Sequence, residues 1–543
     1  MLSRSANVKY FPLVLSLILI IPITALPINL SSHLLIISKA WSASYYVDAT
    51  NGKDINNGLS PSAAWKTIAK INASRFNPGD QILFKRGDSW YEPIIPNSSG
   101  SAGMPIILDA YGQGNLPIIG VGTERAIDIN DKSYLTIENL DLRARDRCIS
   151  IGAWNSGTKY GITIRNNTMT SSAHGVYINC TSGAYDTISI TENTITPGKT
   201  GLWQIGINFV AGVSNFIIRN NIISPAGEDG IMIHKCYDGI ISGNTLGGNV
   251  ENSIDVKNSH DIVIFGNHCA DDGEANIVVH DADTAPNDLT YNITVEKNKC
   301  FRGGQGDRAG QGYRIYAGIF FLYANNCIIR YNWVEEAFGT GILILDLESK
   351  VNNNKVYGNI IFTCGTGTGA ISQGGIQIGD CVGTKVYNNT IYNQQGTGGH
   401  GIYVLGGPHT IGIEIKNNII HTTGGDLIRV LSSAQKNYVS DYNCFYPDGR
   451  KFYWGNAYAN SFSDWKTKSR MDLHSLATDP QFNSTLKGDF ALKITSPCRD
   501  QGTNVGLTKD FNGLPIPQGK GADMGAIESS SSNISPPTNL RME

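Results

Sequence analysis

The sequence predicts an all-β fold: a single-stranded right-handed parallel β-helix with a strand-helix cap at the N-terminus and an irregular cap at the C-terminus. Three observations predict it: an asparagine every 23 to 34 residues, an alternating apolar stretch before each one, and 61 glycines in 543 residues. A period of this size indicates one structural unit stacked on itself. The repeating asparagines are Asn139, Asn167, Asn193, Asn221, Asn244, Asn267, Asn298, Asn332, Asn359, Asn389, Asn418 and Asn443.

Each repeat reads as short strands and turns. Stretches such as GITIRNN, TISITEN and NFIIRNN alternate with period two, so one side chain points inward and the next outward. No repeat has room for a long helix as well, and each coil is therefore expected to pair in parallel with the next. Asparagine suits the bend because it tolerates left-handed backbone angles, and stacked amides are expected to form a ladder. A β-sandwich fits poorly, since it has no reason to place one residue type at the same point of every repeat.

Composition excludes some partners. A net charge of -3 without a basic run gives no case for nucleic acid. The ten cysteines do not form a small-domain disulfide framework. Cys269 and Cys300 fall in an inward column and are expected to be packed thiols, although stacked neighbours could also be bridged. We expect a monomer.

Residues 1–43 are expected to be a signal peptide. Arg4 and Lys9 precede an apolar run over 11–26, and small residues at 42–44 offer a cleavage point. The segment is long for a signal peptide, so an uncleaved membrane anchor is the alternative. Either reading places most of the chain outside the cytoplasm, secreted or at the cell surface, with no membrane contact beyond this segment.

A β-helix has open ends with unpaired strand edges, so caps are required. The cap at 44–99 is expected to contain a helix begun by Ser60 and Pro61, with Ala64, Ile68 and Ile71 as its apolar stripe. Coils are expected over 100–445. The period breaks over 446–528, the expected C-terminal cap, and 529–543 is a Ser/Pro-rich linker tail.

Aligning the coils on their asparagines exposes a second column, which points outward from a later strand. Three adjacent coils place His234, Lys257 and His280 there, while the other positions are small, amide or apolar. Strand spacing puts neighbours about 4.8 Å apart, so the two imidazoles would lie about 10 Å apart with the amine between them. Asp255 is the other outward residue of the lysine's strand.

Carboxylates gather in the same coils. Glu228, Glu251 and Glu274 are expected to stack in one column before these strands, with three aspartates close by: Asp229, Asp271 and Asp272. Stacked glutamates repel one another, so a cation or basic groups should lie against them. The simpler interpretation is a solvated surface ion-pair ladder, but imidazoles, an ammonium and a bank of acids in the same three coils favour a functional site.

These coils resemble the pectate-lyase-like β-helix superfamily. The N-terminal YYVDATNGKD…GLSPSAAWKTIAKIN…GDQILFKRGD and the C-terminal SPCRDQGT…GADMGAIE look like the ends of its secreted bacterial members, so the resemblance covers nearly all of the mature chain. It is specific for fold and weak for activity, since the superfamily includes lyases, hydrolases, epimerases and adhesins. In members that cleave uronate polysaccharides, the substrate lies across this strand face.

The resemblance implies a lyase that acts on an acidic, uronate-containing polysaccharide by abstracting the C5 proton. Lys257 is similar in placement to the lysine base of chondroitinase-B-like and alginate lyases, and flanking cationic imidazoles should lower its pKa. His280 stands where those enzymes carry an arginine, and His234 is expected to bind the substrate carboxylate or to act as the acid.

A calcium ion is the expected cofactor, with Glu228, Glu251, Glu274, Asp229, Asp271 and Asp272 as candidate ligands. Their spacing departs from the Asn-plus-two-Glu pattern of the family. Substrate contacts are expected from Asp255 and from three arginines of one long loop: Arg302, Arg308 and Arg314.

Other activities remain open at this point. Uronate C5-epimerisation begins with the same proton abstraction. A glycoside hydrolase needs two carboxylates across the bond, and of the polygalacturonase-like signatures only Asp271-Asp272 is present. A non-catalytic carbohydrate-binding or adhesive rod would leave the His-Lys-His strip solvated and use aromatic platforms: Trp203, Tyr316, Tyr323 and Trp333.

Overall fold

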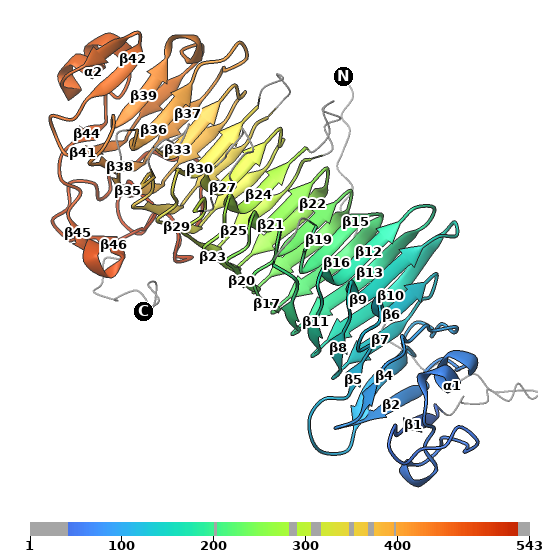
Figure 1. The fold of residues 1–543 in the computed structure, drawn as a ribbon. Coiled ribbons are helices and arrows are strands. Elements are labelled where there is room, and N and C mark those ends of the chain that lie inside the picture. The colour runs from blue at the N-terminus through green and yellow to red at the C-terminus, as the bar shows by residue number, and fades with distance from the viewer. Residues whose placement is uncertain are drawn as a thin grey trace, which may run out of the picture. The chain divides into compact units, whose positions relative to one another are not determined.

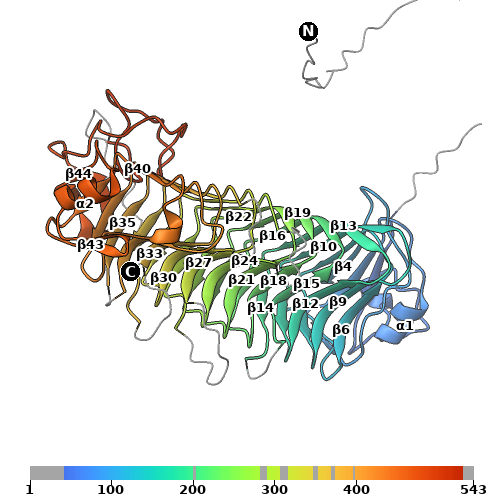
Figure 2. The same ribbon diagram turned by 90° about the horizontal axis from the view of Figure 1, so that it is seen from above.

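The computed structural model describes residues 42–199, 203–281, 290–305, 316–346, 352–367, 374–395 and 398–529. The expected signal peptide (1–43) and linker tail (529–543) therefore lie almost wholly outside the described residues. From Ser42 on, the described chain winds as a parallel β-helix of three long sheets, here called A, B and C (Figures 1 and 2). The predicted fold class is confirmed.

Each sheet takes one strand from every coil, and sequence-successive coils are neighbours in the sheet. Sheet A consists of β1 (Ser44–Val47), β2 (Gln81–Lys85), β4 (Ile106–Tyr111), β7 (Leu135–Glu138), β10 (Thr158–Arg165), β13 (Ala184–Thr191), β16 (Val213–Arg219), β19 (Tyr237–Ser242), β22 (His260–Phe265), β25 (Thr294–Glu296), β28 (Ile328–Arg330), β31 (Lys355–Tyr357), β34 (Lys385–Tyr387), β37 (Glu414–Lys416) and β40 (Val439–Asp441). Sheet B consists of β3 (Ser89–Trp90), β5 (Ile118–Ile119), β8 (Asp141–Arg143), β11 (Thr168–Thr170), β14 (Thr194–Thr196), β17 (Ile222–Ile223), β20 (Thr245–Gly247), β23 (His268–Ala270), β26 (Lys299–Phe301), β29 (Trp333–Glu335), β32 (Ile360–Phe362), β35 (Thr390–Gln394), β38 (Ile419–Thr422), β41 (Cys444–Tyr446) and β44 (Leu476–Ala477).

Sheet C carries the candidate site. It consists of β6 (Arg125–Asn130), β9 (Arg147–Ala153), β12 (His174–Cys180), β15 (Ile207–Ala211), β18 (Ile231–His234), β21 (Asn252–Lys257), β24 (Ala275–His280), β27 (Ala317–Leu322), β30 (Thr340–Leu345), β33 (Gly374–Gly379), β36 (His400–Leu405), β39 (Ile428–Leu431), β42 (Phe452–Gly455) and β43 (Ala457–Ala459). Strand pairs in the three sheets are parallel except β42 with β43, and β45 (Phe482–Ser484) pairs antiparallel with β46 (Asp489–Leu492) outside them.

The interior is a stack of aliphatic side chains, because the inward residue of each strand lies over its counterpart in the next coil. In sheet C, Ile254, Ile277, Ile319 and Ile342 pair in succession and are fully buried. Burial of this kind supplies the main favourable term in folding. In sheet B, the buried Cys269 pairs with Cys300, and both thiols are free, as the packed-thiol interpretation predicted.

A ladder of buried asparagine amides runs along one corner. The Oδ1 atom of Asn298 accepts the backbone N–H of Asn267 (2.9 Å) and its Nδ2 (3.0 Å), and the Nδ2 of Asn298 donates to the next rung, Asn332 (3.0 Å). The same pattern joins eleven asparagines: Asn167, Asn193, Asn221, Asn244, Asn267, Asn298, Asn332, Asn359, Asn389, Asn418 and Asn443. The predicted ladder is confirmed.

Two details of that prediction are wrong. The left-handed residue of the bend is the one before each rung, for example Asn166 (φ 55°) and Lys297 (φ 54°). The rung itself uses its amide rather than its backbone tolerance. Asn139 also lies at φ 56°, and it is Leu140 whose N–H reaches Asn167 Oδ1 (3.1 Å), so Asn139 precedes the ladder rather than joining it.

The N-terminal segment before the regular coils contains two short helices, where the sequence predicted one. Ser60 caps a 3-10 helix, η1 (Pro61–Ala63), and Ala64 then returns to an extended conformation. Thr67 caps the second helix, α1 (Ile68–Ala73), whose Ile68 and Ile71 are buried. Ser60 and Thr67 each accept a backbone N–H, and two capping side chains seven positions apart divide the segment.

The C-terminal region adds short elements around the last coils: η2 (Ser432–Ala434), α2 (Phe462–Ser469) and η3 (Thr485–Lys487). The ladder ends there, where Asn443 donates to Ser475 Oγ (2.8 Å) and to Asp472 Oδ1 (3.1 Å). No helix among the described residues is long and apolar enough to cross a membrane.

Replacing a central rung should destabilise the fold. In Asn298→Ala, the N–H and Nδ2 of Asn267 lose their acceptor inside a buried corner, so we expect the free energy of unfolding to fall by about 3 kcal/mol. Urea unfolding followed by circular dichroism measures this. The exposed Asn456→Ala is the matched control and should change it by less than about 0.5 kcal/mol. Equal effects of the two substitutions would contradict a stabilising ladder.

Candidate functional site

Three successive strands of sheet C bring the predicted strip together. His234 at the end of β18 pairs with Lys257 at the end of β21, and Lys257 pairs with His280 at the end of β24. The column continues to Leu322, as the alignment of coils predicted. One position differs upstream, because a β-bulge in the pairing of β12 with β15 sets Asn179 opposite Ala211.

Asp255, on the same strand as Lys257, lies beneath the exposed ends of Lys257 and His280 and contacts both. Its Oδ2 lies 2.9 Å from the Nζ of Lys257, and its Oδ1 lies 3.0 Å from the Nε2 of His280. The Asp255 side chain is 4% exposed, whereas those of Lys257 and His280 are 19% and 20% exposed. A buried carboxylate thus holds an ammonium and an imidazole side by side at the surface.

The charges around Lys257 overturn one expectation. Burial by itself lowers the pKa of Lys257, but the Asp255 and Asp229 carboxylates outweigh it and hold the pKa well above its usual value. The predicted lowering by neighbouring imidazoles is therefore wrong, since the nearest partner of the amine is an acid. Burial likewise tends to raise the pKa of Asp255, yet His280 and Lys257 lower it overall. The site therefore contains an ionised Asp255 beneath a protonated Lys257.

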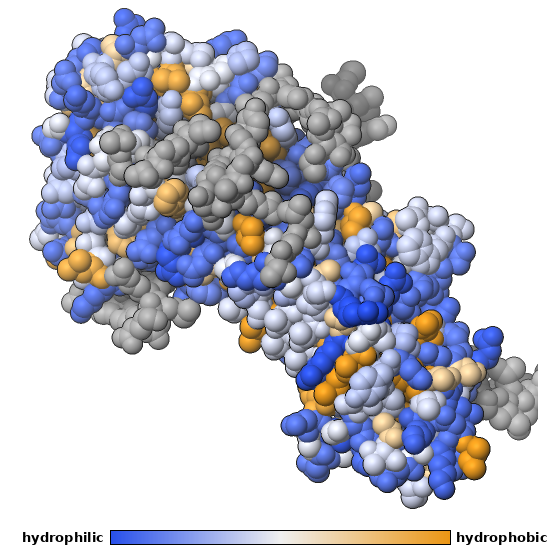
Figure 3. Space-filling model, in the orientation of Figure 1, coloured by the Kyte–Doolittle hydropathy of each residue, from blue (hydrophilic) through white to orange (hydrophobic). Residues whose placement is uncertain are grey.

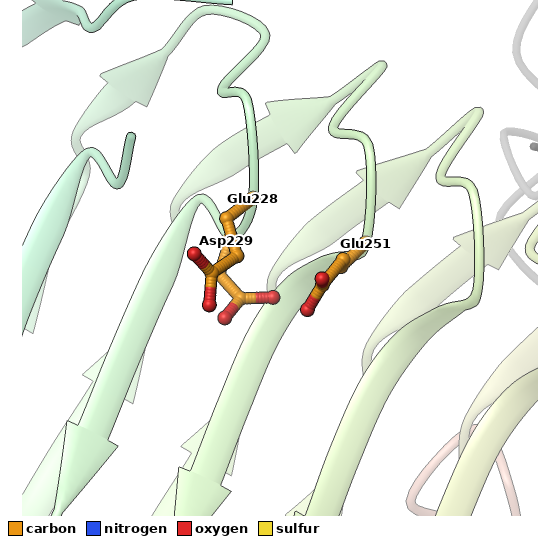
Figure 4. A group of neighbouring side chains, drawn as sticks. All are labelled: Glu228, Asp229 and Glu251. Carbon is orange, nitrogen blue, oxygen red and sulfur yellow. The ribbon is translucent and has the colours of Figure 1, made fainter. Parts of the chain in front are cut away.

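A second row, made of acids, lies where these strands begin. Glu251 donates its N–H to the carbonyl of Glu228 (3.0 Å), and Glu274 donates to Glu251 (2.9 Å), so the three glutamates stack in successive coils as predicted. The carboxylates of Glu228, Asp229 and Glu251 converge, each offering an oxygen within 4.8 Å of the others (Figure 4). No other group of three metal-ligating side chains this close occurs among the residues that the structure describes.

Asp229 is the buried member of this acidic group. Its Oδ1 accepts the N–H (3.1 Å) and the Nδ2 (2.9 Å) of Asn252, whereas its Oδ2 is buried without a hydrogen-bond partner within the described part of the chain. Burial, followed by the charge of Asp255, raises the pKa of Asp229 well above its usual value. Glu228 is fixed differently, since it accepts the backbone N–H of Trp203 at 2.7 Å.

Other predicted site residues lie apart from this cluster. Asp271 follows β23 and Arg302 follows β26, two paired strands of sheet B. The Oδ2 of Asp271 lies 2.9 Å from the guanidinium Nη2 of Arg302. Asp272 is fully buried and accepts hydrogen bonds from Asn249 (2.8 Å) and Ser253 (2.6 Å). The structure therefore does not bring Asp271, Asp272 or Arg302 to the candidate metal group. Arg308 and Arg314 lie outside the described residues.

Sequence reasoning did not single out two residues of this face. Asn252 orients Asp229 by donating two hydrogen bonds to it. The sequence feature that could have indicated this is that Asn252 occupies the equivalent turn one coil later. Trp154 projects two residues beyond Gly152, a member of the outer column, and its indole lies close enough that a Cβ on Gly152 would be 2.5 Å from Nε1. The run CISIGAW places this tryptophan just past the column, which was the available signal.

The buried Asp272 predicts a pH effect on stability. Burial raises its pKa to about 7, so between about pH 4, its ordinary range, and pH 7 only the folded chain holds the proton. The free energy of unfolding should therefore fall as the pH rises through this interval. Asp272→Asn should remove this part of the pH dependence, because an amide does not titrate in this range. The Asn276 side chain, which donates to Asp272 Oδ2, would flip so that its own oxygen accepts a hydrogen bond from the new NH2 group.

Urea unfolding of the wild type and of Asp272→Asn across this pH interval measures the effect. Asp271→Asn is the matched control: Arg302 lowers the pKa of Asp271, so its titration falls below the interval. An unchanged slope in Asp272→Asn would contradict the assignment of a protonated, structural Asp272.

Comparison with known proteins places the chain. A model of the family "Right handed beta helix region" matches residues 125–289 and 315–464, together more than half of the chain. A lacto-N-biosidase of Bifidobacterium longum subsp. longum is 23% identical over 353 residues, 53% of this chain but only 22% of that enzyme's own length. The uncharacterised protein YwoF of Bacillus subtilis is 23% identical over 505 residues, 84% of this chain and 92% of YwoF.

Among solved structures, pectate lyase Pel9A is 16% identical, with a TM-score of 0.34 over 90% of this chain and 96% of that one. At this identity a structural likeness concerns the fold alone. The match of the family model agrees with the three parallel sheets and the asparagine ladder. The chain belongs to the right-handed β-helix family.

Proposed function

We propose that the protein is an extracellular enzyme that cleaves a uronate-containing polysaccharide by β-elimination at the His-Lys-His strip. The observation that carries the proposal is Asp255, which holds Lys257 and His280 side by side at the surface. The similarity to a lacto-N-biosidase and the likeness to a pectate lyase are consistent with a carbohydrate substrate. The strip supplies a cation and a proton acceptor, which proton abstraction next to a carboxylate requires.

The raised pKa of Lys257 changes the roles that the resemblance implied. A protonated Lys257 neutralises the uronate carboxylate and so acidifies the C5 proton, while His234 in the preceding coil binds the same carboxylate. His280 acts as the base: its Nε2 faces the ionised Asp255, which leaves the lone pair of a neutral imidazole on Nδ1. The C5–H electrons form the C4=C5 double bond, the C4–O bond breaks, and the departing oxygen takes a proton from Lys257 or solvent.

Glycoside hydrolysis is the second candidate. One observation favours it: the pKa of Asp229 is raised and that of Asp255 is lowered, a pairing typical of an acid and a base. Burial argues against it, because Asp229 is 0% exposed and Asp255 3% exposed, and Asp255 is engaged through both oxygens. Two carboxylates that flank a glycosidic bond have to reach it. The two groups that Asp255 holds, Lys257 and His280, do reach the surface.

Calcium is proposed as a cofactor at the acidic group. Glu228, Asp229 and Glu251 offer oxygen ligands, which Ca²⁺ prefers, and the buried Oδ2 of Asp229 has no hydrogen-bond partner among the described residues. Such an ion would supply positive charge to attract an acidic polymer to the start of the strands. The carboxylate of Glu274 is not part of the close group, so its role as a ligand stays a prediction.

Activity assays separate the candidates. Incubation with pectate, alginate and glycosaminoglycans should give ultraviolet absorbance of an unsaturated uronate, and Lys257→Ala or His280→Ala should lower the rate about 10²- to 10⁴-fold. Lys355→Ala and His260→Ala, both on sheet A, are matched controls and should retain the rate. New reducing ends without absorbance would indicate hydrolysis, and altered C5 configuration without cleavage would indicate epimerisation. Retention of intact polymer would indicate a binding protein.

Calcium binding is tested by titration calorimetry and thermal unfolding. We expect Ca²⁺ to raise the melting temperature of the wild type, because an ion bound only by the folded state stabilises it. Glu251→Gln should weaken binding, since it removes a charged ligand. Glu124→Gln, a glutamate paired with Arg145 far from the group, is the control. A melting temperature indifferent to Ca²⁺ and to EDTA would contradict the site.

A further inference from the structure

The outer face of sheet C changes character at the site. The outward column that contains Asp255 continues toward the C-terminus as Val278, Phe320 and Leu343, which are buried and apolar. Toward the N-terminus, beyond Met232, the column is polar: Asn208, Tyr177, Ser150 and Asp128. Asn208 and Ser150 are themselves buried, so the partly exposed Tyr177 and Asp128 are the members of this column that a polyhydroxylated chain can reach.

Trp154 stands on that side, directly over the neighbouring column. Its indole lies against Gly152, where any Cβ would collide with the ring, and its Nε1 donates to Asn130 Oδ1 at 2.7 Å. Half of the residue's surface (50%) is nevertheless exposed. The surface facing the viewer in Figure 3 is mainly hydrophilic with small separate hydrophobic patches, as is ordinary for a surface exposed to water.

The loop that carries Trp154 is held by charged groups on both sides. The Asp131 carboxylate accepts the N–H of Trp154 (3.1 Å) and of Asn155 (3.0 Å). The Nζ of Lys159 donates to the carbonyls of Asn155 (3.1 Å), Ser156 (3.3 Å) and Gly157 (3.2 Å). The exposed indole is thus fixed in position before any ligand arrives, and a preorganised ring loses little conformational entropy on binding.

The position of the ring matches a substrate that runs along the solenoid. Gly152 on β9 and Lys257 on β21 belong to the same outer column, four coils apart, which is about 19 Å at about 4.8 Å per strand. Asn179 lies between them, with its Nδ2 3.3 Å from the hydroxyl of Tyr177. Arg147 stacks on the Tyr177 ring, 3.8 Å from its centroid, and adds a cation beside this path.

We infer that Trp154 forms a pyranose-binding subsite that holds a distant sugar unit of the polysaccharide whose cleavage is proposed above. The C–H face of a pyranose buries apolar surface against the indole, while Asn130, Tyr177 and Asn179 meet its hydroxyl groups. Arg147 suits a uronate carboxylate near the same path. The subsite rests on the proposed function for the identity of the polymer but makes its own prediction about chain length.

Binding is measured in the Lys257→Ala background, where substrate is consumed about 10²- to 10⁴-fold more slowly, by affinity electrophoresis in polygalacturonate, alginate and chondroitin sulfate. In whichever polymer retards the Lys257→Ala protein, adding Trp154→Ala should raise the dissociation constant about tenfold. Trp154→Phe keeps a ring and should keep most of the affinity. Tyr91→Ala removes another exposed aromatic, in the N-terminal segment, and should have no effect. Unchanged melting temperatures confirm that the variants fold.

Kinetics with the otherwise wild-type enzyme supply the second test. Trp154→Ala should raise KM for oligosaccharides long enough to reach from Lys257 to Trp154 and leave kcat/KM for the shortest cleaved substrates unchanged. Equal affinity for long chains with and without Trp154, equal loss for long and short ones, or retention by none of the polymers would overturn the subsite. Trp154-dependent binding without unsaturated product would retain the subsite and reject the elimination chemistry. Formation of unsaturated product at a rate that does not depend on Trp154 would support the elimination chemistry and reject the subsite.

Discussion

The buried amide ladder is the interaction on which the rest of the structure depends. A parallel stack of short strands with aliphatic interiors is compatible with several relative positions of its coils, because one isoleucine packs on another in much the same way wherever it stands. Each ladder asparagine removes that freedom, since its Oδ1 accepts two hydrogen bonds from the preceding rung, and a slipped coil would leave buried donors unpaired. The register that aligns distant outward side chains is therefore fixed by amides on another corner.

Most of the fold could be predicted from the sequence, because the repeat signals inward and outward positions independently of loop length. The column His234, Lys257, His280 and Leu322 followed from the two inward apolar positions of each strand, since the residue after the second one points outward, and strand pairing agrees with it. The bulge that shifts Asn179 to Ala211 could not be predicted in the same way. Counting assumes regular pairing, and a bulge adds a residue to one strand without a fixed sequence pattern.

The chemistry of the site was less accessible than its position. The expectation for Lys257 considered the imidazoles of its own column, which are the neighbours that a coil alignment makes visible. Asp255 and Asp229 were visible in the sequence, but the structure shows that Asp255 contacts the amine and that these two acids decide its pKa. Asp271 and Asp272 show the opposite error. They lie close to Glu274 in sequence, but one faces Arg302 outside and the other faces Asn249 and Ser253 inside.

A solenoid separates two demands that a compact fold must satisfy in one cavity. The proposed proton abstraction needs a few groups held in close contact, and Asp255 contacts Lys257 and His280 within two adjacent strands. The proposed recognition of a long polymer needs contacts spaced along the chain, and the Trp154 indole covers Gly152, four coils away on the column of Lys257. Because the coil spacing is set by the backbone hydrogen bonds of the sheet, the two places remain at a constant distance. Under the proposed function a shorter substrate reaches only the first place, so chain length, rather than the rate of chemistry alone, reports on the second.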